Sequence, residues 1–75
     1  MTIPVAEHAF GEERRERIVA VVNARGRVRI GELAREVAAS EPTVRKDLAL
    51  LERAGLLRRT HGGALAVHPN VDREL

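Results

Sequence analysis

The residue types best suited to polar recognition gather in the stretch S-E-P-T-V-R-K, which starts at residue 40. Ser40 is a strong helix N-cap, Pro42 fits a first helical turn, and Thr43 supplies a second hydroxyl. Arg45 and Lys46 follow in the next turn. At an exposed helix start, arginine can donate two hydrogen bonds to a base edge of duplex DNA, whereas ammonium and hydroxyl groups suit phosphates. We expect Arg45 to contact bases and Lys46, which lacks the guanidinium fork, to contact phosphate.

The remaining members of this stretch have two roles open to them. Ser40 and Thr43 can cap the helix, and they can also donate to phosphate; the two roles are compatible. Pro42 shapes the turn and could touch a thymine methyl group.

A second polar cluster ends in a pair of glycines. It consists of Arg58, Arg59, Thr60, His61, Gly62 and Gly63. Glycine permits a tight turn at His61-Gly62-Gly63 and lets backbone N–H groups approach a phosphate closely. An ordinary hairpin turn is the alternative, but the neighbouring arginines favour a turn that touches DNA. We expect Asp47, which DNA would repel, to point sideways and pair with Arg58 or Arg59.

No other group of side chains predicts catalysis or metal binding. The histidines, His8, His61 and His68, come without any cysteine, so we expect no metal and no cofactor. There is no Ser/His/Asp, Cys/His or paired-carboxylate arrangement, and a chain of 75 residues has no room for an enclosed catalytic cleft. We therefore do not expect an enzyme.

Length and composition indicate one small domain with an aliphatic core. Aromatic residues make up only 1% of the chain, so Leu, Val, Ile and Ala must form that core. The net charge is only +2, but basic residues cluster in residues 25–29 and 45–61, where a polyanion could bind. The chain lacks cysteine, a membrane-length apolar run and a signal sequence, so we expect a cytoplasmic protein with no membrane partner.

The hydrophobic spacing predicts the elements that must position the polar clusters, beginning with a helix and a strand. Acidic residues in a first turn, followed by an apolar stripe, predict a helix from residue 12 to a stop at Gly26. The arginines at positions 14, 15 and 17 are expected to pair with neighbouring glutamates, with phosphate contact as the alternative. Alternation in residues 27–30 predicts a short strand, with Val28 and Ile30 inward, that could pair with the hairpin. Residues 1–11 are expected to form a tail in which Phe10 packs on the first helix, or a disordered leader.

Two further helices and a hairpin complete the pattern. A second helix is expected over residues 32–38, capped by Gly31, and it must cross the third steeply because only residues 39–41 separate them. Val44, Leu48 and Leu51 share the buried face of the third helix, which ends at Gly55. The pattern predicts a mainly α fold with a small β-hairpin: a three-helix winged helix-turn-helix over residues 12–67. Its helix-turn-helix spans about residues 28–47 and its wing about residues 56–67, and residues 68–75 are expected to begin a linker.

Four motifs connect these elements to a known family. They are E-L-A from residue 32, S-x-x-T-V-R-K-D-L from residue 40, L-E-R-A-G-L from residue 51 and R-T-H-G-G-A from residue 59. Together they resemble the N-terminal winged helix-turn-helix domain of the DeoR family of bacterial transcriptional regulators. The chain departs from that family at Lys46, where a second arginine is usual, and at Ala39, where valine is usual.

The resemblance implies sequence-specific binding of a double-stranded DNA operator, as the DNA-binding part of a transcriptional repressor of sugar or related metabolism. It also implies a C-terminal domain, absent from this chain, that binds a phosphorylated sugar-type effector and holds a homo-oligomer together. The alternative is a winged helix that binds protein or dimerises without binding DNA, which the apolar Leu50 keeps open. The basic face through Arg45, Lys46 and Arg53 favours DNA, since an interaction module would expose a contiguous apolar patch there.

Overall fold

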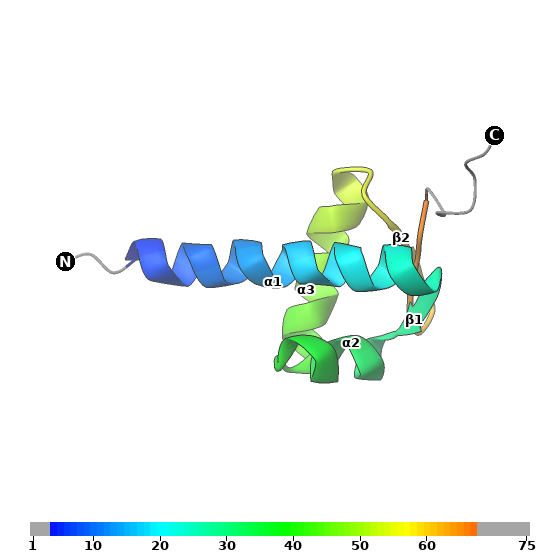
Figure 1. Cartoon of the computed structure of the whole chain (residues 1–75), viewed down its shortest axis with the longest axis horizontal. Helices are drawn as coiled ribbons and strands as arrows, with labels where there is room; N and C mark the ends of the chain where they lie inside the picture. Colours follow the sequence, from blue (N-terminus) through cyan, green and yellow to red (C-terminus); the bar gives the residue numbers. More distant parts are fainter. Residues whose placement is uncertain (1–3, 68–75) are drawn as a thin grey trace.

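The computed structural model describes residues 4–67, and the side chains of residues 10–67. Its six elements follow the predicted order (Figure 1). They are α1 (Pro4–Arg25), β1 (Arg27–Arg29), α2 (Ile30–Val37), α3 (Glu41–Arg53), β2 (Arg58–Thr60) and β3 (Gly63–Leu65). Three helices with a small antiparallel sheet form a winged helix-turn-helix, as predicted. The linker predicted for residues 68–75 lies outside the described residues.

The first helix is longer than the sequence predicted. It begins at Pro4, so the prediction of a tail up to residue 11 is wrong from that residue onward. Proline needs no N–H partner in a first helical turn, and a helix tolerates the interior Gly11 at a cost of about 1 kcal/mol. Phe10 does not pack on α1 but belongs to it, and it is 66% exposed. The N-terminal part of α1 consequently extends past the other elements (Figure 1).

The turn between α2 and α3 is formed by an alanine in the left-handed conformation. Ala38, at φ 54° and ψ 49°, ends α2, and its N–H and that of Ala39 donate to carbonyls of the last helical turn.

The start of α2 lies earlier than predicted. The helix begins at Ile30, after Arg29, so the predicted cap at Gly31 is wrong. Glu32 explains the earlier start, because its carboxylate accepts a hydrogen bond of 3.3 Å from the backbone N–H of Arg29.

The sheet joins the predicted strand to the hairpin in the order β1-β3-β2, with both pairs antiparallel. Val28 lies opposite Ala64, and both are buried, which confirms the inward direction of Val28. Ile30, also predicted to point inward from the strand, instead starts α2 and is only half-buried. We refer to β2, β3 and the turn between them as the wing.

An aliphatic core lies between the three helices and the inner face of the sheet. Its buried members are Ile18, Val22, Val28, Leu33, Val44, Leu48, Leu51, Leu57 and Ala64. The predicted stripe of Val44, Leu48 and Leu51 on α3 is thereby confirmed. No helix among the described residues is long and apolar enough to cross a membrane.

Candidate nucleic-acid interface

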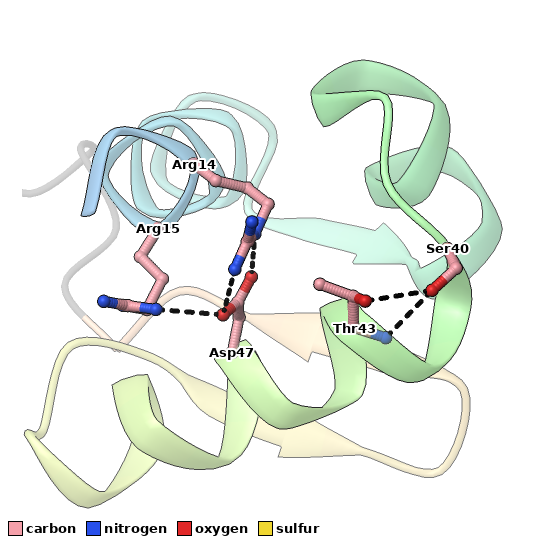
Figure 2. Close-up of polar contacts among 5 residues, drawn as sticks. All are labelled: Arg14, Arg15, Ser40, Thr43 and Asp47. Carbon is pink, nitrogen blue, oxygen red and sulfur yellow. Dashed lines mark hydrogen bonds and ion pairs between the residues drawn. The ribbon is translucent and has the colours of Figure 1, made fainter. Parts of the chain in front are cut away.

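The start of α3 is capped as its sequence predicts. Ser40 adopts an extended conformation, and its Oγ accepts a hydrogen bond of 3.2 Å from the backbone N–H of Thr43. The same hydroxyl donates to Oγ1 of Thr43 over 3.0 Å (Figure 2). Pro42 occupies the first turn, where no N–H is required. The hydroxyl hydrogen of Thr43 is not used in this pair, so it remains the donor that this cap can offer to a phosphate.

Two basic side chains project from the next turn of α3. Arg45 is 60% exposed, and its guanidinium lies 3.5 Å from the carboxylate of Glu41, one turn earlier. An exposed pair of this kind contributes only about 0.3–0.5 kcal/mol, so a DNA contact can replace it at little cost. Lys46 is exposed and has no acidic partner among the described residues.

The wing is attached to α3 through Glu52. One carboxylate oxygen of Glu52 accepts a hydrogen bond of 2.9 Å from the backbone N–H of Arg59, and the other lies 3.6 Å from the guanidinium of the same residue. The sequence signal for this contact is weak, because Glu52 is one of several exposed charges on α3. Glu52 therefore has the role that we predicted for Asp47.

Asp47 is not exposed, and the prediction that it pairs with Arg58 or Arg59 is wrong. Its side chain is 3% exposed and receives Arg14 and Arg15 from α1 (Figure 2). Arg14 donates through Nε to one carboxylate oxygen and through Nη2 to the other, the second bond being 3.1 Å, and Arg15 donates over 3.2 Å. The hydrogen bond to Asp47 raises the pKa of Arg14.

The same contacts correct the prediction for the arginines of the first helix. Arg14 and Arg15 pair across to α3 rather than only with neighbouring glutamates. The sequence did contain a signal that Asp47 is buried, because Asp47 follows Val44 by three positions and precedes Leu48 by one. Helical spacing therefore places Asp47 on the buried stripe, where a carboxylate requires a cationic partner.

Six of the predicted residues, one from α3 and five from the wing, meet around one hollow of about 220 Å³. Its lining consists of Ile30, Arg45, Leu48, Arg59, Thr60, His61, Gly62 and Gly63. We call it the helix–wing hollow. Arg45 from α3 and Arg59 from β2 border it together, so one basic residue from the helix and one from the wing line the same concave surface. Ser40, Pro42, Thr43, Lys46 and Arg58 are not part of its lining.

The two glycines of the wing have different environments. Gly62 lies in the turn with His61, is exposed, and has open space where a Cβ would stand. Gly63 is instead the first residue of β3 and is buried, so the predicted turn of three residues is one residue too long. A Cβ on Gly63 would lie 2.0 Å from the carbonyl oxygen of Val28, so glycine is required there for β3 to approach β1. DNA contact at either glycine stays a prediction.

His61, the histidine whose side chain lies among the described residues, gives no indication of a metal site. His61 is exposed at the wing, whereas the side chains of His8 and His68 lie outside the described residues. Within residues 10–67, no three His, Cys, Asp or Glu side chains form a group that could hold a metal ion.

Similar proteins share the part of the chain that contains this interface. The sequence matches the family described as "DeoR-like helix-turn-helix domain" over residues 14–70. It is 47% identical over 55 residues to the "Putative galactitol utilization operon repressor" of Escherichia coli (strain K12), covering 73% of this chain and 49% of that protein. It is 47% identical over 53 residues to a lactose phosphotransferase system repressor of Streptococcus mutans, covering 71% of this chain and 21% of the repressor.

A third relative, the transcriptional repressor AccR of Agrobacterium fabrum, is 43% identical over 56 residues, which are 75% of this chain and 22% of AccR. The chain thus spans about half the length of the first relative and about a fifth of the other two. No solved structure matches it significantly. The family match includes α1 from residue 14 onward and all of α2, α3 and the sheet. The chain belongs to the family of DeoR-like helix-turn-helix domains.

Proposed function

We propose that this domain binds operator DNA sequence-specifically, as the DNA-binding domain of a bacterial transcriptional repressor of sugar or related metabolism. The observation that supports it best is the helix–wing hollow, where Arg45 of α3 and Arg59 of the wing border one concave surface. A major groove about 12 Å wide accepts a helix such as α3, and an arginine in its first turns can form two hydrogen bonds with guanine. The three relatives described above carry repressor names, which supports repression rather than activation of transcription.

The interface residues divide into two roles in this proposal. Arg45 contacts base edges from the major groove, while Pro42 contacts a thymine methyl group. The contacts to phosphate come from the other predicted residues, which position the domain on the duplex without selecting its sequence. They are Ser40, Thr43, Lys46, Arg58, Arg59, Thr60, His61, Gly62 and Gly63.

We also propose that residues 12–67 form the N-terminal DNA-binding domain of a longer cytoplasmic protein, with a linker beginning at residue 68. The much greater length of two of the relatives supports this arrangement. The further domain would bind a phosphorylated sugar-type effector and hold the homo-oligomer together, which agrees with a relative named as a lactose phosphotransferase system repressor.

A protein-interaction module without DNA binding is not favoured. Leu50 is 47% exposed, but its neighbours on the surface of α3, at i−4 and i+3, are Lys46 and Arg53. Basic side chains therefore flank Leu50 on two sides along this helix.

A salt titration tests the proposal. The 75-residue chain is mixed with a fluorescently labelled duplex of mixed sequence, and the dissociation constant is measured by anisotropy at several salt concentrations. Because lysine and arginine displace condensed counterions, log affinity should fall linearly with log salt, by about 0.9 for each phosphate contacted. A flat response, or no binding at low salt, would contradict DNA binding.

A further inference from the structure

The face of the sheet opposite the helices, which we call the outer face, concentrates positive charge. In β1 the side chains of Arg27 and Arg29 are exposed on either side of buried Val28, so both lie on the outer face. Across β3, Arg27 is in register with Arg58, and Arg29 is in register with Thr60. Directly opposed residues of antiparallel strands point to the same face. The outer face therefore contains the side chains of three arginines, one threonine and, between Arg27 and Arg58, the half-buried Leu65.

These arginines differ from those of the helix–wing hollow in lacking acidic partners. Arg45 and Arg59 each lie near a glutamate of α3, at 3.5 and 3.6 Å. Arg27, Arg29 and Arg58 form no side-chain ion pair or hydrogen bond within residues 10–67. The three guanidinium groups therefore have no ion-pair partner among residues 10–67, where Glu32 contacts Arg29 only through the backbone N–H of that arginine.

The outer face also has a concave site of its own. A hollow of about 270 Å³ is lined by Arg27, Val28, Arg29, Thr60, Gly62 and Gly63. Thr60, Gly62 and Gly63 line the helix–wing hollow as well, so the tip of the wing lies between two hollows. Each hollow has arginines at its border, Arg27 and Arg29 on the outer side and Arg45 and Arg59 on the helix side.

We propose that the outer face is a second site for the phosphate backbone of duplex DNA. This inference rests on the proposed function, and it adds Arg27 and Arg29 of β1 to the DNA contacts. Charge complementarity supports a phosphate occupant, because the planar guanidinium fork matches two phosphate oxygens. Since the wing tip separates the two hollows, the outer face contacts a stretch of backbone other than the one that faces α3. DNA thereby passes along both sides of the wing.

The test compares the loss of charge from two different surfaces. The double variant Arg27→Gln, Arg29→Gln removes two charges from the outer face. The control, Arg35→Gln, removes one exposed charge from α2, outside both hollows and outside the proposed DNA contacts, and the effects are compared per charge removed. Both are titrated with salt on a long mixed-sequence DNA duplex and on double-stranded RNA of matched sequence, after circular dichroism has shown parental helix content.

For DNA, we expect the outer-face variant to reduce the slope of log affinity against log salt by about 1.8, because two phosphate contacts worth about 0.9 each are lost. The control should retain the parental slope. An unchanged slope in the outer-face variant, equal losses per charge removed in both variants, or a larger effect on RNA than on DNA would overturn the inference while leaving the proposed function intact. A parent chain that binds no duplex would overturn the proposed function itself, and this inference with it.

Discussion

Replacing Asp47 with alanine should destabilise the domain more than any substitution of an exposed charge. Asp47 is 2% exposed and connects α3 to α1 through Arg14 and Arg15. The variant Asp47→Ala leaves two guanidinium groups beside an apolar cavity without their acceptor. It also removes the ion pairs that connect α3 to α1.

The expected loss of stability follows from the number of hydrogen bonds that Asp47 accepts and from the exposure of the arginine side chains that donate them. Asp47 accepts three hydrogen bonds from charged donors, and loss of one partner of a buried pair costs about 3–5 kcal/mol. The lower limit applies, because the side chains of Arg14 and Arg15 are 25% and 24% exposed and water screens them. We expect a loss of about 3 kcal/mol for Asp47→Ala. For Arg15→Ala, which removes a single bond of 3.2 Å, we expect about 1 kcal/mol.

Urea unfolding followed by circular dichroism measures these changes. With a slope of about 1 kcal/mol per molar urea, Asp47→Ala should lower the midpoint by about 3 M. A double-mutant cycle of Arg14→Ala with Asp47→Ala isolates the pair, and its coupling should be about 2 kcal/mol. Arg17→Ala, an exposed position on the same helix, is the control and should leave stability nearly unchanged. Parental stability of Asp47→Ala, or a coupling of zero, would refute this account of the buried pair.

Four further predictions concern the core, the turn between α2 and α3, and the interface. Leu48→Ala, at a position 2% exposed, should cost about 2–5 kcal/mol in the same urea assay, and a parental midpoint would contradict its burial in the core. Ala38→Gly should stabilise the domain by about 0.5–1 kcal/mol, because alanine at φ 54° is strained and glycine is not; a lowered midpoint would count against that strain. On an operator selected from random duplexes, Arg45→Ala should cost about 1–3 kcal/mol and relax sequence preference, measured against scrambled DNA. Arg59→Ala should weaken binding to both duplexes equally and reduce the salt slope by about one, so a changed sequence preference would reverse these roles.

The local features of the domain were predictable from the sequence alone. The Ser40 cap, the end of α3 before Gly55 at φ 80°, and the burial of Val28 between two exposed arginines all agree with the prediction. Each depends on residues within a few positions of one another, because capping and side-chain periodicity act within one or two turns. The aliphatic stripe of α3 was predictable for the same reason.

Only the tertiary structure decided which side chains meet across the fold. Asp47 pairs with Arg14, 33 positions away, because the crossing of α1 and α3 brings that arginine against the buried face of α3. Arg59 pairs with Glu52 rather than Asp47 because β2 passes the last turns of α3. Gly63 was predictable as a glycine position but not as the point where β3 approaches β1. Pairing between distant residues depends on crossing angles and strand register, which the packing of the whole core determines and which no local sequence pattern contains.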